Sequence, residues 1–103
     1  MGEVLPFRRE PAVTDREPLW REVVGEQLRQ ERAERGERLV DVAGRAGVSA
    51  QYLSELERGL KEPSSEVLAA VAGALQLKVV ELATRASRRL LVQSFSGPVC
   101  LAA

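Results

Sequence analysis

The sequence contains no histidine and only one cysteine, Cys100, among its 103 residues. A histidine-dependent catalytic triad and a His/Cys metal cluster are therefore excluded, and a single cysteine cannot close an intrachain disulfide. Neither a pair of catalytic carboxylates nor a glycine-rich phosphate loop is recognisable. We accordingly expect no enzymatic activity, no metal and no cofactor. The lack of disulfides suits a reducing cytoplasm, where Cys100 is better explained as an incidental thiol than as a redox sensor.

Long apolar runs and an excess of one charge are also missing. The longest apolar run, 67–75, is far shorter than the roughly 20 residues that a membrane-spanning helix needs. The N-terminal segment MGEVLPFRREPAV has no apolar region typical of a signal peptide, so a membrane is not an expected partner. Fifteen basic and fifteen acidic residues give zero net charge. This balance disfavours strong nonspecific binding to nucleic acids but leaves room for a local basic patch.

What the sequence does have is the composition of one globular, helical domain. Hydrophobic residues make up 45% and charged residues 29%, which is typical of a folded chain. No alternation of apolar and polar residues indicates a strand, so we expect an all-α fold. A chain this short leaves much surface exposed, and dimerisation would bury part of it. The predicted divisions are a flexible N-terminal arm (1–17), a helical domain (18–92) and a C-terminal tail (93–103).

Apolar periodicity predicts five helices. Trp20, Val24 and Leu28 recur at intervals of four residues and mark the buried stripe of the first helix. The predicted helices run from Pro18 to near Arg35, over 39–46, over 50–57, from an N-cap at Ser64 to about Leu75, and from Val79 to Leu90.

The second and third of these helices form the most informative pattern. Gly47 lies where the connection needs a positive φ, which costs a residue with a Cβ about 1 kcal/mol or more. Ser49 can cap the following helix through its hydroxyl, and Leu53 and Leu56 anchor that helix inward. Two short helices joined in this way form a helix-turn-helix unit, whose second helix can enter the DNA major groove.

With these residues in place, the chain from about Leu28 to Leu82 resembles the lambda-repressor-like (Cro/xenobiotic-response-element) helix-turn-helix family. The shared positions are Gly36, Ala43, Gly47-Val48-Ser49, Leu53-Ser54, Leu56-Glu57-Arg58-Gly59, Pro63-Ser64, Leu68 and Ala74-Leu75. Within that family, residues 52–70 are similar to an actinobacterial branch of regulators of Clp protease and related stress genes. The resemblance implies a five-helix lambda-repressor-like domain that regulates transcription as a homodimer on an inverted repeat of double-stranded DNA. It also implies a location on the nucleoid and RNA polymerase as a partner.

The resemblance further implies which side chains meet DNA. The residues expected at base edges are Ala50, Gln51, Ser54 and Glu55. Gln51 suits a bidentate contact with adenine, and Glu55 can accept from cytosine N4. The residues expected at phosphates are Arg38, Ser49, Tyr52, Arg58, Lys61 and Ser64. Arg38 stands where many family members have a capping serine or threonine. The alternative to its phosphate contact is a side chain that is simply exposed to solvent. An ordinary solvated helix face is the alternative for the other polar positions.

Two charged residues on buried stripes are expected to pair. Arg32 continues the stripe of Trp20, Val24 and Leu28, and Glu57 lies one turn past Leu53 on the inner side of its helix. Each would be a poorly solvated charge without the other, so we expect an ion pair between them. In the resembled family, these positions form a structural salt bridge between the first and third helices.

The last predicted helix is longer than a small core requires. Its apolar stripe is a candidate dimer seam made by Leu82, Ala86, Leu90 and Leu91. The alternative is that this stripe closes the core of the monomer. Arg85, Arg88 and Arg89 are expected to cover the far side of the helix.

The C-terminal residues suggest a protein partner. Leu101-Ala102-Ala103 resembles the terminal tripeptide of tags recognised by the ClpX unfoldase, so these residues are a candidate degradation signal for a ClpX/ClpP-type protease. A tail packed on the dimer, or simply frayed, is the alternative. A second functional class is an antitoxin or partner-binding module built on the same fold, although the 17-residue arm and short tail leave little chain to wrap a toxin.

Overall fold

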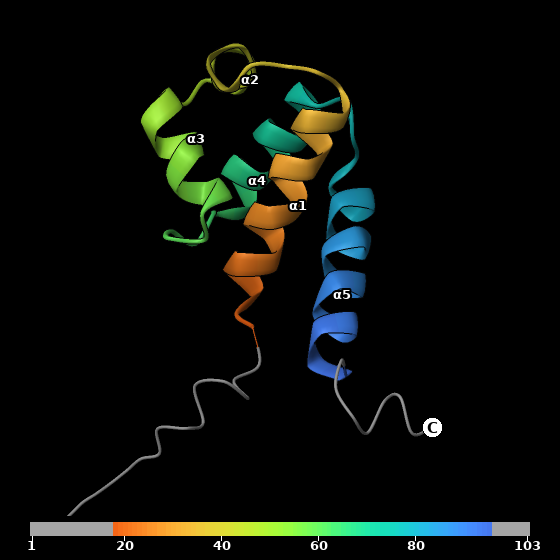
Figure 1. Ribbon diagram of the computed structural model, residues 1–103. Coiled ribbons are helices and arrows are strands. Elements are labelled where there is room, and N and C mark those ends of the chain that lie inside the picture. Colours follow the sequence, from red (N-terminus) through yellow and green to blue (C-terminus); the bar gives the residue numbers. More distant parts are fainter. Residues whose placement is uncertain (1–17, 96–103) are drawn as a thin grey trace, which may run out of the picture.

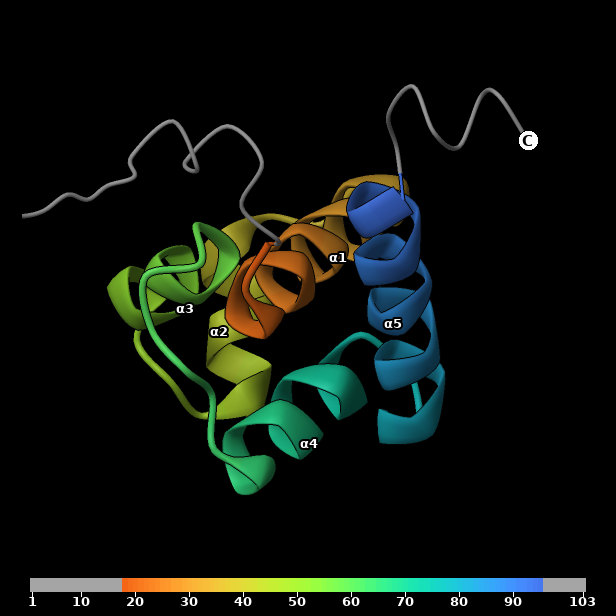
Figure 2. The same ribbon diagram turned by 90° about the horizontal axis from the view of Figure 1, so that it is seen from below.

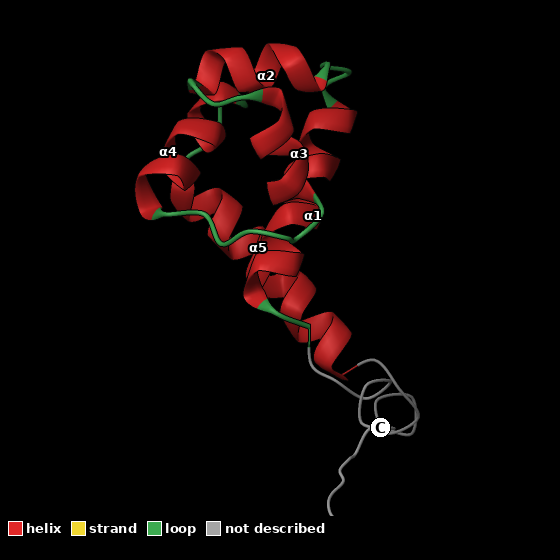
Figure 3. Cartoon of the chain, turned by 90° about the vertical axis from the view of Figure 1, so that its left-hand side faces the viewer, coloured by secondary structure: helices red, strands yellow, loops and turns green. Residues whose placement is uncertain are grey.

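The computed structural model describes residues 18–95, which form five helices and no strand (Figures 1 and 3). The helices are α1 (Trp20–Glu34), α2 (Leu39–Ala46), α3 (Ala50–Glu57), α4 (Ser65–Ala74) and α5 (Val79–Phe95). The predicted all-α, five-helix fold is confirmed. The expected N-terminal arm, Cys100 and the candidate degradation signal at Leu101, Ala102 and Ala103 lie outside the described residues.

The predicted bounds of α2 and α3 match the structure, whereas two other ends differ. α1 begins at Trp20, after Leu19, whose backbone N–H donates to the Glu22 carboxylate at 2.9 Å. Pro18 therefore precedes the helix instead of opening it. α5 extends to Phe95, three residues into the expected tail. Gln93 donates from its side-chain amide to the Glu26 carboxylate at 3.2 Å, which ties this additional turn to α1.

α1 is the central helix of the fold, with α3 packed on one side of it and α5 on the other (Figures 1 and 2). α4 packs against α2 and α5 and closes the core between them; it lies at the bottom of the view in Figure 2. The largest fully buried apolar side chains are Val23, Val24, Leu28, Val42, Leu53, Leu56, Val71, Leu75 and Leu82. Every helix thus contributes to a single core, as the apolar stripes predict.

The predicted dimer seam is wrong for two of its four residues. Leu82 and Ala86 have no exposed surface within the monomer, because their side of α5 packs into the core. Leu90 is half-buried against the same core. Only Leu91, which is 57% exposed, faces solvent. The alternative, in which the stripe closes the monomer core, holds for Leu82 and Ala86.

The arginines of α5 also differ from expectation, because Arg85 and Arg89 face α1. Glu31 of α1 is only 2% exposed and accepts hydrogen bonds from Gln27 at 2.7 Å, Arg35 at 2.7 Å and Arg85 at 2.6 Å. Burial raises the pKa of the Glu31 carboxyl, but the bonds from Arg85, Arg35 and Gln27 outweigh this effect and lower it. Arg89 donates to Gln27 at 2.8 Å. A buried polar network therefore joins α1 to α5.

No single helix in the described part of the chain is long and apolar enough to cross a membrane. The α4–α5 pair meets the criteria of length and composition but is bent by 100° at its break.

Candidate nucleic-acid interface

The connection between α2 and α3 is a tight left-handed turn. Gly47 has a φ of 76° and a ψ of 26°, and the Val48 N–H donates to the Ala43 carbonyl at 3.0 Å. A Cβ at Gly47 would have no atom within 4 Å, so the positive φ, not crowding, is what favours glycine here. Ser49 then accepts from the Tyr52 N–H at 3.0 Å and caps α3. The turn chemistry read from the sequence is thus present in the structure.

α3 lies directly on the backbone of α1. A Cβ at Gly25 would lie 2.1 Å from the carbonyl oxygen of Leu56 and 2.8 Å from that of Glu57. Only glycine permits this approach, because a real Cβ does not come within 3.0 Å of another heavy atom. This contact was not predicted from the sequence, where its one available signal is a glycine inside a helix, which carries a cost relative to alanine.

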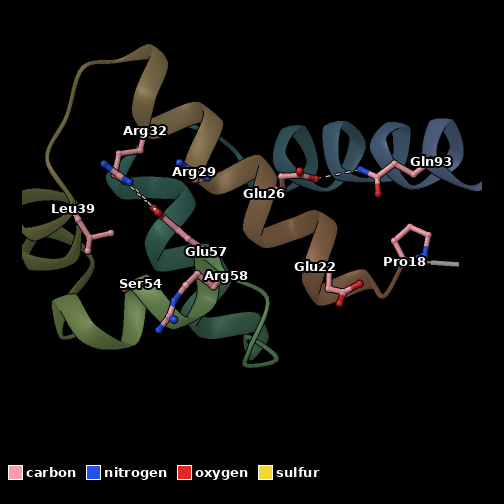
Figure 4. A pocket seen from close by; sticks show the side chains of 10 residues that line it. All are labelled: Pro18, Glu22, Glu26, Arg29, Arg32, Leu39, Ser54, Glu57, Arg58 and Gln93. Carbon is pink, nitrogen blue, oxygen red and sulfur yellow. Dashed lines mark hydrogen bonds and ion pairs between the residues drawn. The ribbon is translucent and has the colours of Figure 1, made fainter. Parts of the chain in front are cut away.

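Arg32 of α1 and Glu57 of α3 form a bidentate ion pair (Figure 4). Arg32 Nε and Nη2 donate to the two carboxylate oxygens of Glu57 at 2.8 and 3.0 Å. The side chains are 20% and 7% exposed. Arg32 Nη1 also donates to the Glu37 carbonyl at 3.1 Å. Hydrogen bonding to Glu57 raises the pKa of Arg32, so the guanidinium stays charged and locks α3 to α1.

The outer side of α3 carries the expected base-contact residues. Leu53 and Leu56 are buried, and the opposite side of the helix presents Gln51, which is exposed, with Ser54 and Glu55 half-buried. Ala50 and the expected phosphate contact Tyr52 both pack partly against the core, so only part of each side chain is available to a ligand. Gln51 is therefore the most accessible of the four residues expected at base edges.

Most of the residues expected at phosphates already have partners within the domain. Arg38 is 78% exposed and pairs with Asp41 at 3.0 Å, and hydrogen bonding to Asp41 raises the pKa of Arg38. Arg58 is exposed and forms no ion pair with any described residue. Ser64 caps α4 by accepting from the Val67 N–H at 3.1 Å. The Ser49 and Ser64 hydroxyls accept in these caps, so their O–H groups stay able to donate to an anion.

A polar groove of about 720 Å³ runs between α1 and α3 (Figure 4). It is lined by Pro18, Glu22, Glu26, Arg29, Arg32, Leu39, Ser54, Glu57, Arg58 and Gln93. Its lining includes Ser54 of α3 and Arg58, the residue that caps the C-terminal end of α3. Over residues 18–95, no group of three or more His, Cys, Asp and Glu side chains is arranged to hold a metal ion.

A short helix that is held on its inner side, follows a tight glycine turn and exposes polar side chains outward has the geometry that reads a DNA major groove. Capping serines and exposed cations at its ends add groups that position a phosphate backbone. The fold and this surface define a helix-turn-helix DNA-binding protein.

Comparison of the sequence with known proteins supports the same class of protein. A family model described as a helix-turn-helix domain matches residues 23–84, and the chain belongs to this family. The transcriptional regulator ClgR of Mycobacterium tuberculosis is 49% identical over 75 residues, which is 73% of this chain and 67% of that protein. The transcriptional regulator DdrOP3 of Deinococcus deserti is 49% identical over 57 residues, which is 55% of this chain and 44% of that protein.

Solved structures give the same result. The clp gene regulator ClgR from Corynebacterium glutamicum superimposes with a TM-score of 0.77 at 41% identity, over 84% of this chain and 93% of that one. The restriction-modification controller protein C.AhdI from Aeromonas hydrophila gives a TM-score of 0.59 at 27% identity, over 60% of this chain and 94% of that one. The chain is a helix-turn-helix transcriptional regulator, and its predicted resemblance to the Clp gene regulator branch is confirmed.

Proposed function

We propose that the chain binds an inverted repeat as a homodimer and regulates the genes of Clp protease or related stress genes. The observation that carries the proposal is the exposed outer side of α3, a helix that the Gly25 contact and the Arg32–Glu57 pair hold against α1. The chain is also 49% identical to a regulator named ClgR. The C. glutamicum ClgR is named as a clp gene regulator, which supports the choice of target genes.

Most side chains at this surface have an individual role in the proposal, and Glu55 and Lys61, which form an ion pair, are treated together below. Gln51 contacts adenine, while Ser54 and Ala50 complete the base-edge surface. Arg58, Arg38 and Tyr52 contact phosphates and set the position of the helix without reading sequence. The Ser49 and Ser64 hydroxyls donate to phosphates beside their capped helix N-termini, which favour an anion.

The proposed dimer forms through the exposed outer side of α5. Val80 and Leu91, about three helical turns apart on this side, are 65% and 57% exposed, so a second copy of the chain could cover both. A two-fold dimer places two copies of α3 in successive major grooves, about 34–36 Å apart. RNA polymerase is the protein partner through which such a regulator would act.

Selection of binding sites from random duplexes tests the proposal. The purified chain should enrich a palindrome whose half-sites are about 10–10.5 base pairs apart from centre to centre. The enriched sequence should occur upstream of clp genes in the source genome. Enrichment of no sequence would reject specific binding, and a single half-site would reject the inverted repeat. A palindrome absent from clp promoters would reject the target genes alone.

The degradation signal is a separate part of the proposal. Leu101, Ala102 and Ala103 would let a ClpX/ClpP-type protease remove the regulator of its own genes, so that falling protease activity allows the regulator to accumulate. Replacing Ala102 and Ala103 with aspartates should lengthen the half-life of the protein in cells. An unchanged half-life would reject this signal without affecting the proposed DNA binding.

A further inference from the structure

Glu55 and Lys61 form an ion pair on the surface that the proposed function places against DNA. Lys61 Nζ lies 3.4 Å from Glu55 Oε1, and the side chains are 54% and 21% exposed, respectively. The sequence assigns Glu55 to a base and Lys61 to a phosphate. In the structure they are each other's partner, so neither can be considered alone.

The backbone keeps the two residues close together. The Gly59 N–H donates to the Leu56 carbonyl at 3.0 Å, and the Leu60 N–H donates to the Glu55 carbonyl at 3.0 Å. Gly59 has a φ of 74°, so the chain turns back along the last turn of α3 and brings Lys61 beside Glu55. Arg21 of α1 donates to the Gly59 carbonyl at 3.1 Å and fixes this turn to the body of the domain. The pair is therefore set by the fold of the segment that follows α3.

Electrostatics make the Glu55–Lys61 pair sensitive to which base pair lies opposite it in the DNA major groove. A carboxylate near DNA is repelled by phosphates, and Lys61 cancels that charge as long as it stays beside Glu55. If Lys61 moves to a phosphate, Glu55 is left unneutralised in a poorly hydrated groove, which is costly unless a donor replaces the ammonium. The major groove offers such donors only on amino groups, cytosine N4 and adenine N6.

We propose that the Glu55–Lys61 pair couples one phosphate contact to the identity of one base pair. At most sequences, Lys61 remains with Glu55 and contributes little to binding. Where a cytosine amino group donates to Glu55, Lys61 is released and takes a phosphate. Glu55 is then a specificity-determining residue, and Lys61 is a positioning residue that acts through it. This inference depends on the proposed DNA binding and changes the role of Lys61, for which the family resemblance implies only a phosphate contact.

The experiment measures binding against salt concentration for two duplexes: the one enriched from random sequences and one of scrambled sequence. The variants are Glu55→Gln, Lys61→Gln and the double variant. Glu62→Gln and Lys78→Gln are the matched controls. Glu62 Oε1 lies 3.9 Å from Arg21 Nη1, away from the Glu55–Lys61 pair. Lys78 is exposed in the connection between α4 and α5. Thermal melting establishes that every variant is folded.

In the otherwise native chain, Lys61→Gln should reduce the log–log salt slope by about one per protomer on the enriched duplex and leave the slope on the scrambled duplex unchanged. Glu55→Gln should lower discrimination at one base pair about tenfold and tighten binding to the scrambled duplex. In the Glu55→Gln background, Lys61→Gln should reduce the slope on both duplexes equally. The two controls should leave discrimination unchanged.

Three results would overturn the coupling: equal weakening of both duplexes by Lys61→Gln in the native background, no effect of Lys61→Gln on either duplex, or strictly additive effects of the two substitutions. All three require that the native chain prefers one duplex. A native chain without any preference would instead reject the proposed function, and the coupling with it.

Discussion

Gly25 of α1 and Leu56 of α3 meet backbone to backbone: a Cβ at position 25 would lie 2.1 Å from the Leu56 carbonyl oxygen. Since the backbone of α3 cannot rotate away as a flexible side chain could, an added methyl group must push the two helices apart. The helix that would be displaced is the one that presents Gln51 and Ser54 to solvent. Stability and DNA recognition therefore depend on the same contact.

Gly25→Ala should lower the free energy of unfolding by about 3 kcal/mol, the upper end of the range for overpacking, and should also weaken DNA binding. The measurement is chemical denaturation together with binding to an enriched duplex. Gly73→Ala is the matched control, because a Cβ there has no atom within 4 Å and the residue lies in helical backbone. It should stabilise the chain by about 0.4–1 kcal/mol. Equal effects of the two substitutions would show that α1 and α3 are not in such close contact.

Glu57→Gln should cost about 3 kcal/mol, because it leaves the Arg32 guanidinium without its charged partner. The cost is at the low end for a buried pair, since Arg32 retains 20% exposure and its bond to the Glu37 carbonyl. Urea denaturation of Glu57→Gln, of a control variant and of the native chain measures this cost. Asp41→Asn, which breaks the exposed pair with Arg38, should cause a much smaller shift in midpoint. A Glu57→Gln shift as small as that of Asp41→Asn would contradict a stabilising role for the buried pair.

The lowered pKa of Glu31 predicts a specific pH dependence of stability. The folded state holds this proton less tightly than the unfolded state, whose ordinary pKa is about 4.5, so the stabilisation is complete above that pH. It is lost as the pH falls through the lower folded value. The difference in denaturation midpoint between the native chain and Glu31→Gln should shrink as the pH is reduced from 6 to 3. A difference that stays constant over this range would contradict the prediction.

A matched substitution on the same helix isolates the effect. Glu34 is exposed and bonded to Gln30 at 2.9 Å, so Glu34→Gln makes the same charge change without removing a hydrogen bond of the α1–α5 network. Its midpoint at pH 7 should stay close to that of the native chain.

Gln51→Ala and Arg58→Gln should separate base reading from phosphate binding. Gln51→Ala should reduce the difference in binding free energy between the preferred base pair and the alternatives by about 1–3 kcal/mol at one position, because a bidentate contact to adenine is lost. Arg58→Gln should weaken binding to all duplexes alike and reduce the salt slope by about one per protomer. Titrations of the enriched duplex and its single-base variants measure both effects. If Gln51→Ala weakened every duplex equally, Gln51 would not contact a base.

Leu91→Asp should shift the chain from dimer to monomer, because it puts a charge into the proposed apolar interface on α5. Sedimentation velocity at several concentrations measures the change. Val40→Asp is the control: Val40 is 55% exposed on α2, similar to the 57% of Leu91. A dimer that persists in Leu91→Asp would remove the exposed side of α5 as the interface.

The parts of the fold that depend on local chemistry could be predicted from the sequence. α2 and α3 begin and end at the predicted residues, because Gly47 and Ser49 fix the turn through their own backbone and hydroxyl groups. The Arg32–Glu57 pair followed from two charges on buried stripes, since each needed a partner and the two stripes face each other.

Apart from that pair, contacts that depend on which helices become neighbours could not be predicted. Glu31 and Arg85 are 54 positions apart, and nothing in either helix alone shows that they meet. The same limit explains the error at Leu82 and Ala86: periodicity identified a buried stripe but not whether the monomer or a second copy covers it. It also explains why the Gly25 contact was missed, because a glycine in a helix does not identify the backbone that approaches it.

The placement of α1 between α3 and α5 has an evolutionary consequence. Substitutions on the outer sides of α3 and α5 fall on surfaces with the whole of α1 between them, and distant sites contribute almost independently to free energy. After gene duplication, one copy could change the nucleotide sequence that it prefers while the proposed dimer interface on α5 stayed intact, or the reverse. Paralogues of this architecture should therefore diverge one face at a time.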